Sequence, residues 1–151
     1  MTDDFRHRTT LGVRFRDIDA FGHVNNAVFF SYVEQARFAY FLDVVAAGEA
    51  FDRLPLILAR VELDFRAPIF YGDEVVVATR IDRIGRSSIG MSHRMTAGPE
   101  GRLAGDVAAV LVTYDYEASR PMPVPEGWRE RMSAYEGRAL EAELSAAAAA
   151  S

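Results

Sequence analysis

Cysteine is absent from this chain of 151 residues, and so is lysine. Without cysteine, disulfides and thiolate metal sites are excluded, and nothing points to an oxidising compartment. Without lysine, every basic side chain except histidine is an arginine, whose planar guanidinium group matches the geometry of phosphate. A genome-wide bias towards arginine and alanine explains the same pattern more simply, so the pattern alone identifies no ligand.

Long hydrophobic runs are also missing. The first ten residues, "MTDDFRHRTT", lack the apolar core of a signal peptide. No apolar run reaches the roughly 18 residues that a membrane-spanning helix needs. The formal net charge of −5 argues against non-specific binding to nucleic acid. We therefore expect a cytoplasmic protein with no membrane and no nucleic-acid partner.

The length and the ordinary globular composition predict one domain. We place this domain at residues 1–136 and a low-complexity tail, which ends in "SAAAAAS", at 137–151. Near the C-terminus, the segment "WRERMSAYEGRALEAEL" (128–144) has the pattern of a short amphipathic helix.

Alternating apolar residues predict a first strand over 10–18. From Asn26 to about Ala47 the chain has no glycine or proline and is apolar at nearly every angle, which is typical of a buried helix. Asn25 is suited to cap its start, and Gly48 to end it. Period-two patterns then predict further strands, which span 59–69, 71–85, 86–97 and 102–117.

This order of elements indicates an α+β domain in which one long helix packs on one antiparallel sheet. A single sheet covers only part of such a helix, and its edge strands stay open. Pairing two sheets edge to edge across a twofold axis would close one edge of each. We therefore predict a homo-oligomer, either a dimer or a dimer of dimers.

The stretch "FRDIDAFGHVNN" (15–26) places several polar side chains just before the long helix. A helix N-terminus presents unpaired N–H groups and the positive end of the helix dipole, which suits a developing oxyanion. A nearby carboxylate such as Asp19 could attack a carbonyl carbon or deprotonate a water molecule. The alternative is that Asp17 and Asp19 only solubilise a loop and that Asn25 is a plain helix cap.

The longer segment "VRFRDIDAFGHVNNAVFFSYVEQAR" resembles the signature of hotdog-fold acyl-CoA thioesterases of the 4-hydroxybenzoyl-CoA thioesterase class. The match is best with members that have an Asp-x-x-x-His-Val-Asn-Asn core. "RIDRIGRSSI" and "RPMPVPE" extend the resemblance over roughly residues 10–128. It implies a hotdog fold, a long central helix wrapped by a curved antiparallel sheet of about five strands. It also implies hydrolysis of an acyl-CoA to a free acid and coenzyme A, without metal or redox cofactor.

The resemblance assigns catalytic roles to three residues. Asp19 falls on the family's catalytic carboxylate, acting as nucleophile or general base. Asn26 falls where a backbone N–H polarises the thioester carbonyl, and His23 where a histidine positions the substrate or a water molecule. The benzoyl-specific members have an apolar residue in place of His23, and the plant acyl-carrier-protein thioesterases have an asparagine in place of Phe21. Neither the benzoyl substrate nor the asparagine-based mechanism therefore transfers.

Substrate contacts follow from the same resemblance. The turn "RIGRSS" corresponds to the family's phosphate-contacting segment, and the residues expected to hold the phosphates of coenzyme A are Arg83, Arg86, Ser87 and Ser88. The alternative for this turn is a solvated β-turn.

Residues of the helix and its cap complete the expected substrate site. Phe29 is expected beside the acyl chain, and Asn25 either contacts the substrate or only caps the helix. Glu34 either faces the site or forms a structural ion pair with Arg37. His93 is expected to be an ordinary hydrogen-bonded histidine of the sheet.

Two other functions stay open at this point. One is a hotdog protein that binds acyl-CoA without catalysis, and the other is a hotdog dehydratase. The first would require a missing or misplaced site carboxylate, whereas Asp19 is present. The second usually has a different arrangement of histidine and acidic residues on the helix.

Overall fold

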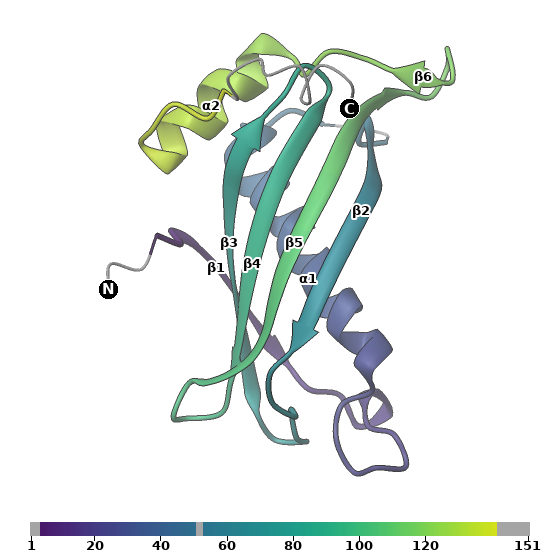
Figure 1. The fold of residues 1–151 in the computed structure, drawn as a ribbon, viewed down its shortest axis with the longest axis vertical. Coiled ribbons are helices and arrows are strands. Elements are labelled where there is room, and N and C mark those ends of the chain that lie inside the picture. Colours follow the sequence, from purple (N-terminus) through teal and green to yellow (C-terminus); the bar gives the residue numbers. More distant parts are fainter. Residues whose placement is uncertain (1–3, 51–52, 142–151) are drawn as a thin grey trace.

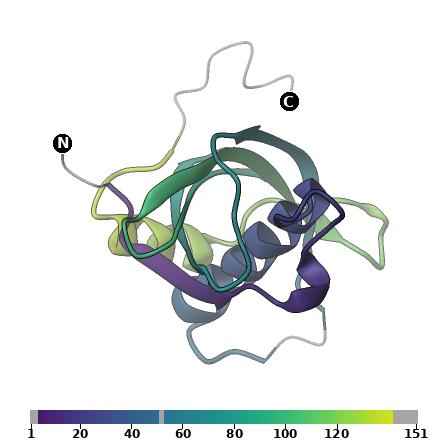
Figure 2. The same cartoon turned by 90° about the horizontal axis from the view of Figure 1, so that it is seen from below.

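Figure 1 shows the computed structural model, which describes residues 4–50 and 53–141. A long helix lies against one face of an antiparallel sheet, and Figure 2 shows that the sheet curls around this helix. The helices and strands are β1 (His7–Gly12), α1 (Asn26–Tyr40), β2 (Leu56–Phe65), β3 (Glu74–Ile84), β4 (Ser88–Ala97), β5 (Arg102–Asp115), β6 (Arg120–Pro121) and α2 (Glu126–Glu136).

The long strands are arranged in the order β1-β3-β4-β5-β2, with every neighbouring pair antiparallel, and the short β6 pairs with β5. β1 and β2 therefore form the two edges of the curved sheet. This arrangement confirms the predicted hotdog architecture of one long helix and about five long strands. The predicted strands 59–69, 71–85, 86–97 and 102–117 correspond to β2 to β5, with small differences at their ends.

Helix α1 is buried on one side only, whereas the sequence pattern predicted burial on all sides. The side that packs on the sheet includes Phe29, Val33 and Ala36, all at most 2% exposed. On the opposite side, Phe30 is 39% exposed and Phe38 is 51% exposed. The prediction was wrong because the single sheet covers only one side of the helix.

The C-terminal end of the long helical segment changes its hydrogen-bonding pattern. The α-helix ends at Tyr40, and a π-helical turn continues it over Phe41–Val45. Ala47 and Gly48 then adopt left-handed backbone angles, with φ of 49° and 86°. The predicted end of the helical segment near Gly48 is thus correct, but its last turns are not α-helical.

The first strand lies earlier in the chain than predicted. β1 spans His7–Gly12 instead of 10–18, and a 3₁₀ turn follows at Phe15–Asp17. The Asp17 carboxylate accepts the backbone N–H of Arg14 at 2.9 Å, which closes this tight turn. Strand alternation therefore stops before Asp17, and Phe15 is 81% exposed.

The folded domain also extends beyond residue 136. α2 ends at Glu136, and Gly137, which caps it, has a left-handed φ of 71°. Leu140 is 2% exposed, and its carbonyl accepts the N–H of Ile84 at 2.7 Å. The first residues of the predicted tail thus still pack on the sheet, and the rest of that tail lies outside the described residues.

None of the helices in the described part of the chain is long and apolar enough to cross a membrane.

Candidate active site

The stretch 18–24 forms a small hairpin immediately before α1. Ile18 and Val24 make an isolated antiparallel bridge, and the N–H of Asp19 donates to the carbonyl of His23 at 3.1 Å. The N–H of Gly22 donates to the carbonyl of Asp19 at 3.0 Å, and the φ of Gly22 is 85°. Asp19 and His23 therefore lie opposite each other across a tight turn that needs glycine at position 22.

The turn also orients the two side chains. Oδ1 of Asp19 accepts the N–H of Phe21 at 2.9 Å, so one carboxylate oxygen is engaged and the other is available to a ligand. Nδ1 of His23 lies 3.2 Å from the carbonyl oxygen of Val24. In the tautomer that carries its proton on Nδ1, this contact is a hydrogen bond and Nε2 is left as an acceptor. The His23 ring stacks on Phe21 with centroids 6.1 Å apart.

The start of α1 presents a free backbone donor. The side chain of Asn25 accepts the N–H of Ala27 at 2.8 Å, so Asn25 acts as the helix cap. Within the described part of the chain, the N–H of Asn26 makes no hydrogen bond. This N–H lies at the positive end of the α1 dipole and can stabilise an oxyanion.

A cavity of about 330 Å³ lies between the start of α1 and the end of β2. Its lining consists of His23, Asn26, Phe29, Phe65, Arg66, Ala67 and Pro68. We call this space the helix-start cavity. The structure thus brings together three of the predicted site residues, His23, Asn26 and Phe29. Asp19 is not part of the lining but is joined to His23 by the hairpin hydrogen bond.

Glu34 belongs to a different cavity, of about 280 Å³, near the C-terminal half of α1. Arg37, Phe38 and the first residues of β2, Leu56–Leu58, line the same space. Burial lowers the pKa of Arg37, and the carboxylate of Glu34 opposes this effect. Glu34 therefore acts on Arg37 electrostatically, and it does not line the helix-start cavity.

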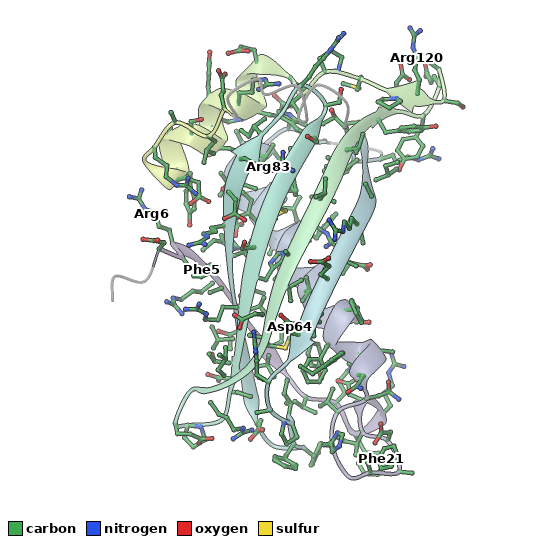
Figure 3. All side chains as sticks on the ribbon, viewed as in Figure 1. Phe5, Arg6, Phe21, Asp64, Arg83 and Arg120 are labelled. Carbon is green, nitrogen blue, oxygen red and sulfur yellow. The ribbon has the colours of Figure 1, made fainter. Side chains whose placement is uncertain are left out.

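The turn Arg83–Ser88 lies at the other end of the sheet from the hairpin. Figure 3 labels Arg83 near one end of the sheet and Phe21, in the hairpin, at the other. The carbonyl of Arg86 accepts the N–H of Val124 at 2.8 Å, and the carbonyl of Ser87 accepts the N–H of Thr113 at 2.8 Å. The turn is thus fixed through its main chain, and the Arg86 residue is exposed. Within this chain, the turn and the hairpin are too far apart to contact one small ligand group.

Asp17 has a more important position than the sequence indicated. It is 1% exposed and accepts hydrogen bonds from Arg14 and from the hydroxyl of Tyr32, the latter at 2.7 Å. The family resemblance indicates a structural role for Asp17, but the strand expected over 10–18 did not predict its burial or its partners. The tyrosine lies 15 positions further along, where no local pattern connects it to the aspartate.

No group of three or more His, Cys, Asp or Glu side chains is placed to hold a metal ion anywhere in residues 4–50 and 53–141.

Comparisons with known proteins place this geometry in a family. The model of the Thioesterase-like superfamily matches residues 13–132. A thioesterase from Thermus thermophilus, solved in complex with coenzyme A and zinc, is 44% identical, with a TM-score of 0.80, covering 91% of this chain and 98% of that one. A putative acyl-CoA thioesterase from Xanthomonas campestris is 35% identical, with a TM-score of 0.64, covering 72% of this chain and 92% of that one.

A curated relative agrees with these structures. The long-chain acyl-CoA thioesterase FadM of Escherichia coli K12 is 22% identical over 130 residues, or 83% of this chain and 96% of the relative. The family model covers the hairpin, α1 and the long strands from β2 to β5, which together carry the candidate site. The chain therefore belongs to the thioesterase-like superfamily and is a thioesterase of the hotdog fold.

Proposed function

We propose that this enzyme hydrolyses an acyl-CoA to a free carboxylic acid and coenzyme A, with Asp19 as nucleophile or general base. The observation that carries this proposal is the pairing of Asp19 with His23 across the hairpin, next to the free N–H of Asn26. His23 and Asn26 line the helix-start cavity, and the hairpin bond holds Asp19 next to His23.

Two routes fit these groups. In the nucleophilic route, an Asp19 oxygen attacks the thioester carbon, the C–S bond breaks and the coenzyme A thiolate leaves and takes up a proton. Water then hydrolyses the mixed anhydride and restores Asp19. In the general-base route, Asp19 takes a proton from water as the water attacks, and that proton passes to the departing thiolate.

The remaining site residues act on the carbonyl and the acyl chain. The N–H of Asn26, together with the α1 dipole, stabilises the negative charge that develops on the thioester oxygen. His23 lines the helix-start cavity and positions the substrate or a water molecule. The ring of Phe29 packs on that of Phe65, with ring centroids 5.1 Å apart, and supplies an apolar wall for the acyl chain.

The similar proteins support coenzyme A as the carrier of the acyl group. The Thermus thermophilus thioesterase was solved with coenzyme A, and FadM is named for acyl-CoA hydrolysis. We propose that the same carrier binds here and that the enzyme uses neither a metal nor a redox cofactor. A cytoplasmic location stays a prediction.

A homodimer would bring the separated parts of the site together. β2 has β5 as its only neighbour among the described strands, so one edge of β2 is free. Antiparallel pairing of β2 with its copy places the start of one β2 beside the end of the other. The hairpin lies where β2 ends and the Arg83–Ser88 turn lies where β2 begins (Figure 1), so each hairpin would approach the partner's turn.

The exposed side of α1 favours the same assembly. Phe30 and Phe38 are exposed there, and Ile57 and Leu58 are exposed on the adjoining β2. A second copy would cover these apolar side chains. We therefore propose a homodimer, alone or within a dimer of dimers, in which Arg83, Arg86, Ser87 and Ser88 of the partner bind the phosphates of coenzyme A.

The test is thiol release from a panel of acyl-CoAs by the wild-type enzyme and by Asp19→Asn. The amide can neither attack the thioester nor accept a proton, so kcat should fall by about 10²–10⁴-fold while the melting temperature is retained. Asp43→Asn is the matched control, because Asp43 pairs with His7 of β1, at the sheet edge opposite β2.

Two outcomes would contradict the assignment. An Asp19→Asn enzyme with wild-type kcat would remove Asp19 from the chemistry. A wild-type protein that binds acyl-CoA in calorimetry but releases no thiol would support the non-catalytic binding function instead.

A further inference from the structure

We propose that Asp17 and Tyr32 form a positioning clamp that fixes the place of Asp19 and His23 relative to the start of α1. This inference rests on the proposed function, because it concerns the residues that carry out the hydrolysis. Neither Asp17 nor Tyr32 lines the helix-start cavity, so the clamp acts through the hairpin and not on the substrate.

The side chain of Asp17 connects the chain before the hairpin with the middle of α1. Its Oδ2 accepts the backbone N–H of Arg14 at 2.9 Å and the hydroxyl of Tyr32 at 2.7 Å. Its Oδ1 accepts Nε and Nη2 of Arg14 at 3.2 and 3.0 Å. Asp17 and Tyr32 are 1% and 2% exposed, so the bond between them forms away from water, whereas the Arg14 side chain is 54% exposed.

The main chain of Asp17 holds the other end of the hairpin. Its carbonyl accepts the N–H of Asn25, the helix cap, at 2.9 Å. Asp17 thus bonds through its side chain to Arg14 and Tyr32, and through its backbone to the start of α1. The segment 18–24 itself has two main-chain bonds to other described residues. The N–H of Ile18 donates to the carbonyl of Phe15 at 3.2 Å, and the N–H of Val24 donates to the carbonyl of Ile69 at 2.8 Å.

The placement of Asp19 therefore depends on the residue two positions before it. If the Asp17 side chain shifts, Ile18 and Val24, which pair at the base of the hairpin, move relative to the N–H of Asn26. A misplacement of about 1 Å between a catalytic group and the reacting atoms can cost on the order of 10²-fold in rate. Binding of the substrate depends far less on such a shift.

The clamp keeps the same charge state over the range in which the enzyme is assayed. Burial raises the pKa of Asp17, but hydrogen bonds from Arg14 and Tyr32 outweigh it and hold the pKa below its usual value. Burial, together with the Asp17 carboxylate, raises the pKa of Tyr32. The pair therefore stays a carboxylate and a phenol at neutral pH and is a permanent support rather than a switch.

The protein contains a matched pair for comparison. The hydroxyl of Tyr40 donates to Oε1 of Glu136 at 2.7 Å, and both residues are buried. This bond has the same chemistry and length as the one between Tyr32 and Asp17, but it joins α1 to α2. Tyr40→Phe therefore controls for the loss of a buried tyrosine–carboxylate bond that has no connection to the hairpin.

The experiment compares Tyr32→Phe with Tyr40→Phe in kcat, KM and melting temperature on one acyl-CoA. We expect similar losses of melting temperature in the two variants. We expect Tyr32→Phe alone to lower kcat, by about tenfold or more, with KM changed by less than about threefold. Equal kcat values in the two variants, or an equal fall in both, would overturn the clamp.

A double variant tests the coupling between Asp17 and Tyr32 directly. If Asp17 and Tyr32 act together, Asp17→Asn combined with Tyr32→Phe should lower kcat by much less than the product of the single effects. Independent, multiplying effects would contradict the proposal.

Amide hydrogen exchange separates this proposal from the proposed function. Tyr32→Phe should speed exchange in residues 18–25 relative to Tyr40→Phe, whatever the reaction is. If Asp19→Asn turns out to be fully active, the function assigned to Asp19 fails, and faster exchange in Tyr32→Phe still supports the clamp. Unchanged exchange in 18–25 would overturn it.

Discussion

The hydroxyl oxygen of Thr79 lies 2.9 Å from Nδ1 of His93, on the neighbouring strands β3 and β4 in the interior. The second ring nitrogen, Nε2, has no hydrogen-bond partner among residues 4–50 and 53–141. The expectation of an ordinary hydrogen-bonded sheet histidine is therefore half correct. Burial, with the nearby charge of Arg37, lowers the pKa of His93 to about 3.

This histidine predicts a loss of stability in mild acid. The unfolded chain takes up a proton at His93 below about pH 6.5, whereas the folded protein does not until about pH 3. The contribution of neutral His93 to the free energy of unfolding is therefore fully present above about pH 6.5, and it decreases as the pH drops from 6.5 towards 3. At pH 5 the loss attributable to His93 should be about 2 kcal/mol.

Denaturant unfolding at pH 7 and pH 5 measures this loss. The glutamine in His93→Gln cannot titrate. The free energy of unfolding should therefore change less between pH 7 and pH 5 in this variant than in the wild type, by about 2 kcal/mol, even if the variant is less stable at both pH values. An equal pH dependence in the wild type and the variant would mean that His93 is protonated in the folded state.

The dimer can be tested on the exposed side of α1. Phe38 is 51% exposed in one subunit and lies beside the free edge of β2. Phe38→Glu would place a charge in the proposed interface, where burial without a partner is costly. Light scattering should then show a monomer at micromolar concentration, whereas Leu103→Glu, an equivalent change on β5, should leave the oligomer intact. A wild-type monomer would contradict the assembly.

Recognition of coenzyme A can be tested at the turn. Arg86→Ala keeps the main-chain bonds that fix this turn but removes the guanidinium group. A charge-assisted bond contributes about 1.5–3 kcal/mol, so KM should rise on the order of ten- to a hundredfold with kcat nearly unchanged. The effect should shrink at high salt. Arg94→Ala, which removes a cation paired with Asp106 on the sheet surface, should not alter KM.

Metal removal should have no effect on the rate. The chemistry is assigned to a carboxylate, a histidine and a backbone N–H, and none of these steps requires a Lewis acid. Dialysis against a chelator should therefore leave kcat unchanged for every acyl-CoA that the enzyme hydrolyses. A loss that zinc or magnesium restores would show that a metal takes part.

Much of the fold could be predicted from short-range patterns. Alternation in β3, β4 and β5, the Asn25 cap and the end of the helical segment near Gly48 all depend on residues that are close in the sequence. The resemblance of residues 15–26 to a family then pointed to the stretch before α1 as the candidate site, but it did not predict the hairpin that this stretch forms.

The failures have a common physical cause. The extent of β1, the burial of Asp17 and the packing of Leu140 on β3 depend on partners distant in the sequence. The apolar alternation of Leu11, Val13 and Phe15 runs past the end of β1, because the Asp17 carboxylate accepts the Arg14 N–H and the chain forms a 3₁₀ turn there. No local pattern distinguishes such an aspartate from a solvent-exposed one.

The separation of the hairpin from the Arg83–Ser88 turn has a genetic consequence. If each site uses the hairpin of one subunit and the turn of the other, a subunit with Asp19→Asn and a subunit with Arg86→Ala are defective in different halves of a site. A mixed dimer of the two contains one site with both defects and one site with neither. Co-expression of the two defective genes should therefore restore hydrolysis at low substrate concentration that neither gene supports alone.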